Sequence, residues 1–188
     1  MRDLSLHILD LIENSIRAKA TAVRVTVWAD PARDRLSVIV EDNGPGLKVP
    51  ARVAVDPFYT TKGGKKTGLG LGLFQATTQR AGGNMTLRRS ALGGLAVAGW
   101  MRLGHVDRSP LGDLAATIST VVCTNPDLHL RVILRAAQTK WELDVKKVAR
   151  ELAADKASPL ISGIELATRV SELMKARLAL WDHQAVLM

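Results

Sequence analysis

Cysteine, aromatic residues and long apolar runs are scarce in this chain of 188 residues. The single cysteine excludes an internal disulfide and a cysteine-based metal cluster. Aromatic residues make up 4% of the chain, too few to favour a stacking platform for single-stranded nucleic acid. No segment approaches the roughly 20 apolar residues of a membrane-spanning helix, and Asp3 and Asp10 lie where a secretory signal would be uncharged. We therefore expect a cytoplasmic protein with no membrane segment.

Positive charge is concentrated in the N-terminal part of the chain. The whole chain carries a net charge of +8, and 47% of its residues are hydrophobic, as in ordinary globular proteins. Residues 1–104 hold 15 basic and 8 acidic residues, whereas residues 105–188 are almost balanced. A basic surface attracts nucleotide phosphate or nucleic acid. Because no motif for reading nucleic acid accompanies the charge, a nucleic-acid partner is the weakest alternative.

Apolar periodicity predicts a mixture of helices and strands. Helices are predicted over residues 4–18, 71–81, 111–123, 145–154 and 160–181, and strands over residues 22–29, 35–41, 84–89, 95–103, 128–136 and 139–145. Residues 56–70 combine glycines and lysines with few apolar anchors, which predicts a mobile loop.

The first predicted helix carries a polar stripe opposite its apolar one. The stripe consists of Asp3, His7, Asp10, Asn14 and Arg17. A solvated helix face is the simpler interpretation. The alternative is a site, because the amide oxygen of Asn14 suits a Mg²⁺ ion that also holds phosphate oxygens. One turn earlier, the carboxylate of Asp10 could accept a proton from a water or hydroxyl nucleophile.

Two glycine-rich segments follow in the chain. Residues 42–46 (DNGPG) end a predicted strand, where Asp42 could accept a hydrogen bond from the exocyclic amine of adenine. Gly44 and Gly46 would let the backbone pass close to a flat ring, although these residues taken alone favour a plain turn. Residues 68–73 (GLGLGL) precede a helix whose N-terminus favours phosphate. They match neither a P-loop nor a dinucleotide fingerprint.

Taken in order, these motifs resemble the Bergerat-fold GHKL superfamily, which includes type II topoisomerase ATPases, heat-shock protein 90, MutL and the ATP-binding domain of sensor histidine kinases. Asn14 resembles the N box, residues 42–46 the G1 box, residues 56–62 (DPFYTTK) the F box and residues 68–73 the G2 box. The resemblance implies an α/β two-layer sandwich. Residues 1–104 would be the ATP-binding domain, and residues 105–188 a small α+β extension for dimerisation or partner binding.

The resemblance implies ATP and Mg²⁺ as cofactors and a role for each motif residue. Asn14 would coordinate Mg²⁺ and Asp42 would bind adenine. Asp10 occupies the position of the general base, where hydrolytic members carry a glutamate that is one methylene longer; Glu13 is the less favoured base. The other implied nucleotide contacts are Gly44, Gly46, Phe58, Lys62, Gly68, Leu69, Gly70 and Gly72.

The expected function is Mg-ATP binding with slow hydrolysis, or with phosphoryl transfer to a serine or threonine of a protein partner. The alternative is a non-catalytic ATP sensor whose lid closure controls partner binding. No histidine begins a phosphoacceptor motif, so a self-sufficient histidine kinase is not expected. Residues 105–113 are similar to the start of an extension in small standalone bacterial ATP-binding proteins. These are often encoded beside genes for iron-hydrogenases or NADH-oxidising complexes, which suggests a component of such a complex as partner. A homodimer is the other assembly considered.

Overall fold

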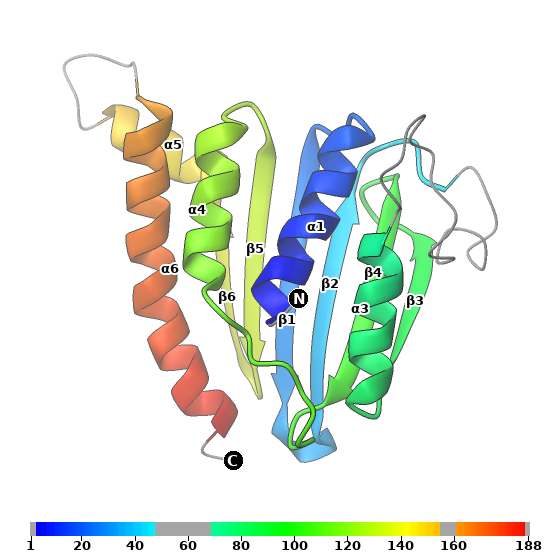
Figure 1. The fold of residues 1–188 in the computed structure, drawn as a ribbon. Coiled ribbons are helices and arrows are strands. Elements are labelled where there is room, and N and C mark those ends of the chain that lie inside the picture. Colours follow the sequence, from blue (N-terminus) through cyan, green and yellow to red (C-terminus); the bar gives the residue numbers. More distant parts are fainter. Residues whose placement is uncertain (1–2, 48–68, 155–160, 187–188) are drawn as a thin grey trace.

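A single six-stranded sheet organises the molecule (Figure 1). The computed structural model describes residues 3–47, 69–154 and 161–186, with side chains to Trp181. The strands are β1 (Ala22–Asp30), β2 (Arg35–Asp42), β3 (Asn84–Arg89), β4 (Leu95–Arg102), β5 (His129–Ala136) and β6 (Thr139–Asp144). The helices are α1 (Leu4–Arg17), α3 (Leu69–Arg80), α4 (Leu114–Thr124), α5 (Val145–Ala154) and α6 (Gly163–Val186), with a short 3₁₀ turn, η1 (Pro31–Arg33).

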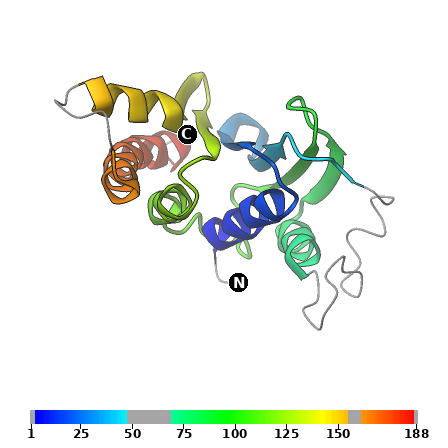
Figure 2. The same ribbon diagram turned by 90° about the horizontal axis from the view of Figure 1, so that it is seen from above.

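The strand order is β3-β4-β2-β1-β5-β6. Every neighbouring pair is antiparallel except β1 and β5, which run parallel over Ala22–Ala29 and His129–Ala136. A parallel pair needs a crossover connection, and α4 supplies it between β4 and β5. Helices α1, α3, α4 and α6 all lie on one side of the sheet (Figure 2), which gives the two-layer α/β sandwich predicted from the sequence.

Alternating side chains place the core between the sheet and this helical layer. In β1, Val23, Val25, Val27 and Ala29 are buried while the residues between them are partly exposed. Because burial alternates with a period of two residues, one face of the strand points toward the helices. Burying each such aliphatic side chain contributes about 2 kcal/mol, so the register of the sheet is strongly specified.

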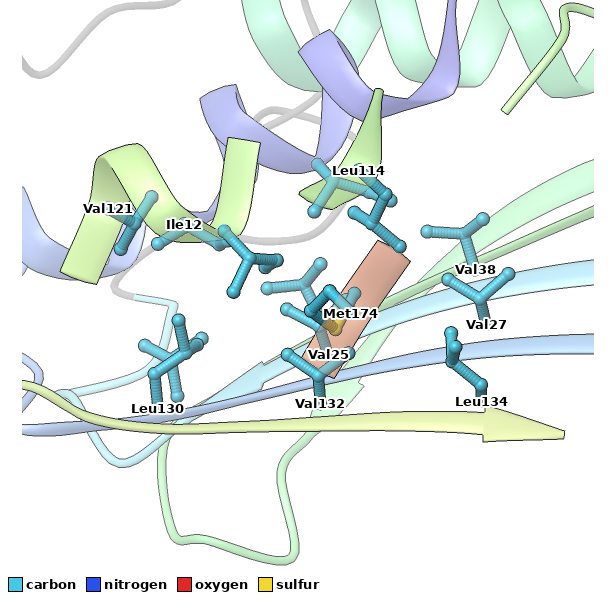
Figure 3. Packing of buried hydrophobic residues seen from close by; sticks show 14 of the residues in the cluster. Ile12, Val25, Val27, Val38, Leu114, Val121, Leu130, Val132, Leu134 and Met174 are labelled. Atoms are coloured by element: carbon cyan, nitrogen blue, oxygen red, sulfur yellow. The ribbon is translucent and has the colours of Figure 1, made fainter. Parts of the chain in front are cut away.

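The core continues without a break past residue 104. Figure 3 shows Leu114 and Val121 of α4 and Met174 of α6 packed toward the same strands as Ile12 of α1. The connection before α4 also caps α1, because Leu4 N–H donates to the Pro110 carbonyl (2.9 Å) and Ser5 N–H to the Leu111 carbonyl (2.8 Å). These are two of the N–H groups that a helix cannot satisfy internally. A dimerisation or partner-binding role for residues 105–188 stays a prediction.

Most predicted elements are confirmed within a few residues. Helix α4 begins at Leu114 rather than 111, because Asp113 is its N-cap and accepts a hydrogen bond from Ala116 N–H (2.8 Å). Helix α3 ends at Arg80, ahead of Gly82, which has φ +70°, and of Gly83, where a Cβ would collide with the backbone of Trp100. Among the described residues, no helix combines the length and apolar character that crossing a membrane requires.

Candidate nucleotide site

Helix α1 lies between the end of β2 and the start of α3, and consecutive residues of α1 reach both. Ser15 faces the strand end and donates to Asp42 Oδ2 (2.8 Å). Asn14 faces the other way, toward Gly70 in the first turn of α3. A step of about 100° per residue along the helix separates the two directions. The structure therefore brings together three segments that are more than 20 residues apart in the chain.

Asp42 is a buried carboxylate held by three hydrogen bonds. The Asp42 residue is 5% exposed to solvent. Oδ1 accepts from Gly44 N–H (2.8 Å) and Leu95 N–H (3.1 Å), and Oδ2 accepts from Ser15. Because each carboxylate oxygen has two lone-pair sites, Oδ2 retains one for a further donor. An amine such as that of adenine is a donor of the required kind.

Glycines leave room for the Asp42 carboxylate. Gly94, in the β3–β4 turn, donates its N–H to the Asp42 carbonyl (3.0 Å). A Cβ at Gly94 would collide with Asp42 Oδ1 and with the Gly44 nitrogen. Gly46 has φ +74°, a left-handed conformation that favours glycine. Gly94 was not singled out from the sequence, where Gly93-Gly94 indicates only a turn between two strands.

Asp10 and Asn14 both contact the start of α3. A Cβ at Gly70 would lie 3.4 Å from Asn14 Nδ2 and 3.4 Å from Asp10 Oδ2, so both side chains lie next to the first turn of α3. The first turn of a helix presents unsatisfied N–H groups and the positive end of its dipole. The Asn14 amide group, the Asp10 carboxylate and this helix end therefore lie close together, an arrangement that suits phosphate oxygens and a hard cation.

Near the C-terminal end of α1, Arg17 binds the side chains of both Asn14 and Glu13. It donates to Asn14 Oδ1 (2.6 Å) and to Glu13 Oε2 (3.1 Å). The Arg17–Glu13 ion pair is about half exposed, which keeps Glu13 on the outer surface of the helix. The Asp10 carboxylate lies next to Gly70 at the start of α3. Coordination of a cation by Asn14 Oδ1 would require Arg17 to release that oxygen.

The interpretation of the polar stripe of α1 as a solvated face is wrong at His7. His7 is 1% exposed, with its Nε2 3.0 Å from the Thr77 hydroxyl and its ring 5.6 Å from that of Phe74. Helix α3 covers the stripe at His7, and helical periodicity cannot reveal which neighbour covers a face. Burial, followed by repulsion from the positive N-terminus, lowers the His7 pKa from its ordinary 6.5 to about 4.

Acid should therefore destabilise the fold through His7. The folded state keeps His7 neutral, whereas the unfolded chain takes up a proton near pH 6.5, so stability present above pH 6.5 is lost as the pH falls toward 4. We expect the loss attributable to His7 to be about 2 kcal/mol after allowance for solvent relaxation. Urea unfolding between pH 7 and pH 4 measures it. In the control, His7→Gln, the free energy of unfolding should change less over this range; equal slopes would contradict the assignment.

Several predicted site residues lie outside the described part of the chain. These are Phe58, Lys62 and Gly68, together with most of the predicted loop over residues 56–70. Leu69 and Gly72 fall in the first turn of α3. Sequence reasoning missed Ser15, although a serine among the aliphatic residues of the first helix was a usable signal for a buried polar contact. No group of three histidine, cysteine, aspartate or glutamate side chains in the described ranges could hold a metal by itself.

This fold, with its helix-borne amide and carboxylate beside a buried strand-end aspartate, is that of an ATP-binding α/β sandwich domain. Residues 2–105 match the family model described as "Histidine kinase-, DNA gyrase B-, and HSP90-like ATPase". The match covers more than half of the chain, and the chain belongs to this family. Domains of this family bind ATP with Mg²⁺.

Curated relatives are similar over the same region. Over 100 residues, the chain is 30% identical to Sensor histidine kinase CpxA and to Sensor protein CpxA from strains of Escherichia coli. The match covers 50% of this chain but 21% of each relative, so the chain spans about a fifth of their length. One solved structure, titled "Crystal Structure of N terminal domain of a DNA repair protein", aligns with a TM-score of 0.47 at 12% identity, over 77% of this chain and 52% of that one.

Proposed function

We propose that this chain binds Mg-ATP at the junction of α1, β2 and α3 and uses it for slow hydrolysis or for phosphoryl transfer to a protein. The observation that carries the proposal is the position of α1. Successive residues of this helix contact the buried Asp42 at one end of the site and the first turn of α3 at the other. A nucleotide has the same two-ended chemistry, with a base at one end and charged phosphates at the other.

The donor set fits the base end of ATP. Asp42 Oδ2 keeps an acceptor site for the adenine amine, and its other hydrogen bonds hold the carboxylate in place. Gly44, Gly46 and Gly94 line the approach with backbone rather than side chains. Guanine carries a carbonyl oxygen where adenine carries this amine, so Asp42 would repel it. This arrangement supports adenine over guanine.

The donor set also fits a magnesium triphosphate. Mg²⁺ usually keeps several waters and is held by one or two protein oxygens together with substrate phosphates. Asn14 Oδ1 would be such an oxygen once Arg17 releases it, and the α3 N-terminus beside the Asn14 amide group favours the phosphate charge. The further contacts that the family resemblance implies are Gly68, Gly70 and Gly72, together with Phe58 and Lys62 earlier in the chain.

Asp10 is the proposed general base. Its carboxylate lies beside Asn14 at the start of α3, whereas Glu13 is paired with Arg17 on the outer surface. It would accept the proton of a water or hydroxyl that attacks the γ-phosphate. The second candidate function is an ATP sensor without turnover. Two observations favour it: Asp10 is one methylene shorter than glutamate, and Arg17 already occupies the Asn14 oxygen.

The proposed partner is a protein that accepts the γ-phosphoryl group of ATP. The curated relatives are named sensor proteins and a sensor histidine kinase, which supports signalling to another protein. Residues 105–113 further suggest the group of small ATP-binding proteins encoded near hydrogenase or NADH-oxidising complex genes. A component of such a complex is therefore the proposed partner, with serine or threonine as the acceptor.

Removing the Asn14 amide tests the metal end of the site. Asn14→Ala should fold normally but lose the Mg²⁺-dependent part of its ATP affinity, because alanine offers no oxygen ligand. Calorimetric titration with ATP in Mg²⁺ and in excess chelator measures that part. The matched control is Gln79→Ala, which removes an exposed amide from the far end of α3 and should leave both titrations unchanged. An Asn14→Ala variant with undiminished Mg²⁺ dependence would place the metal elsewhere.

Incubation with γ-labelled ATP separates the candidate functions. The purified chain is tested alone and with cell extract. Label released as phosphate indicates hydrolysis, label transferred to a protein indicates a kinase, and label retained as bound ATP indicates a sensor. Failure to bind ATP at all would refute the proposal.

A further inference from the structure

Among the residues that the structure describes, strand β6 forms one edge of the sheet. It pairs with β5 on one side, and it is the last strand in the sheet order. Strand β3 forms the other edge. A free edge presents backbone N–H and C=O groups that can pair with another strand.

Two backbone hydrogen bonds between the β1 and β5 segments show which residues of β6 have backbone groups that face outward. His129 N–H donates to the Thr21 carbonyl (2.9 Å) and Ala137 N–H to the Ala29 carbonyl (3.3 Å), so odd-numbered residues of the β5 segment direct their backbone toward β1. Even-numbered residues of β5 therefore face β6, where Leu134 is paired with Trp141. By the same alternation, the backbone of Trp141 faces β5, and the backbones of Lys140 and Glu142 face away from the sheet.

We propose that β6 pairs antiparallel with β6 of a second copy of this chain, about a two-fold axis at Trp141. This register places Lys140 opposite Glu142 of the second copy, and Glu142 opposite its Lys140. Both residues have outward-facing backbone, so each pair exchanges two backbone hydrogen bonds. The two copies then form one continuous twelve-stranded sheet with an isologous interface.

Charge complementarity selects a second copy as the occupant of this edge. Lys140 and Glu142 already form an ion pair within the strand (2.9 Å), and in the dimer the four charges alternate across the axis. An axis at Lys140 or at Glu142 would instead place like charges opposite each other, which is destabilising. The β3 edge cannot pair with itself in this way, because it carries Arg88 and Arg89 and no acidic residue.

An apolar surface beside the edge supports the same axis. Trp141, on the helical side of the sheet, lines a pocket of about 200 Å³ with Arg177 and Leu180 of α6. Leu180 is 55% exposed, and Arg177 stacks over the Trp141 ring (5.9 Å). In the proposed register Trp141 faces Trp141 of the second copy at a non-hydrogen-bonded position, where Cα atoms approach to about 4.5 Å. Buried tryptophan and arginine at the centre with charges around them are typical of stable interfaces.

Charge reversal tests the pairing without touching the core. Lys140 and Glu142 side chains are 54% and 36% exposed, so their variants should fold, which thermal unfolding checks. In sedimentation velocity at rising concentration the parent chain should dimerise. Lys140→Glu and Glu142→Lys should each weaken the dimer about tenfold or more, because two pairs become repulsive. The double exchange should dimerise like the parent, and a mixture of the two single variants should form a heterodimer.

A disulfide cross-link tests whether the two-fold axis lies at Trp141. In a Cys123→Ser background, needed because Cys123 is exposed, Trp141→Cys should oxidise to a disulfide-linked dimer. The matched control, Thr139→Cys, would lie roughly 13 Å from its counterpart and should stay monomeric on a non-reducing gel. The proposal is overturned if the parent stays monomeric at every concentration or if the charge variants dimerise as the parent does. Open-ended assemblies, as β6 pairing with β3 would give, also overturn it.

Discussion

Asp42→Asn should bind ATP about 10- to 100-fold more weakly than the parent chain while keeping its fold. The asparagine oxygen can still accept from the Gly44 and Leu95 N–H groups, and its NH₂ can donate to the Ser15 hydroxyl, so the local network survives. The atom left facing the base is then an N–H donor instead of an acceptor. It would oppose the donor of the adenine amine, and calorimetric titration with ATP measures the loss.

Two controls separate base recognition from damage to the site. Thermal unfolding of Asp42→Asn should be close to that of the parent, because only one hydrogen-bond polarity changes. The parent should also prefer ATP over GTP, and the variant should lose much of that preference. Equal affinity of the parent for both nucleotides would refute the assignment of Asp42 to adenine.

Asp10→Asn should bind ATP almost normally and lose turnover, or partner phosphorylation, by about 10²–10⁴-fold. The amide keeps the shape of the carboxylate against Gly70 but cannot accept the proton of the nucleophile. Steady-state phosphate release, or label transfer to the partner, measures the loss. Asp10→Glu restores the longer arm of hydrolytic relatives and should raise hydrolysis if reach limits the parent.

Glu13→Gln is the matched comparison on the same helix. Its carboxylate is paired with Arg17 on the outer surface, so the amide should leave turnover unchanged. Loss of turnover in Glu13→Gln, with full activity in Asp10→Asn, would make Glu13 the base. If the parent shows no turnover with any extract and Asp10→Glu gains none, the ATP sensor is the better account.

The elements could be predicted from the sequence because their signals are local. The alternation in β1 and the apolar stripe of α1 each specify one element and one buried face. Where β5 would lie was not predictable, since nothing local to residues 129–136 indicates that they pair in parallel with residues 22–29. Periodicity reports which face of an element is buried, but it does not report the neighbour.

In the candidate site, too, local signals were predictable from the sequence and contacts between distant segments were not. Asn14 and Asp42 were found because short motifs surround them, and the structure brings their segments together through Ser15. Ser15 and Gly94 were missed, because each matters through a contact with Asp42 that lies 27 or more residues away in sequence. His7 was misjudged for a related reason: the residues that bury it belong to α3 and not to its own helix.

The parallel pairing of β1 with β5 has a practical consequence for anyone who wishes to transplant this ATP-binding module into another protein. A gene fragment ending at residue 105, where the family match stops, would strip β1 of its neighbour along Ala22–Ala29. It would also delete the Pro110 and Leu111 carbonyls that complete the first turn of α1. An uncovered, valine-rich edge of this kind promotes aggregation. The transferable unit is therefore longer than the family signature, and it includes at least α4 and β5.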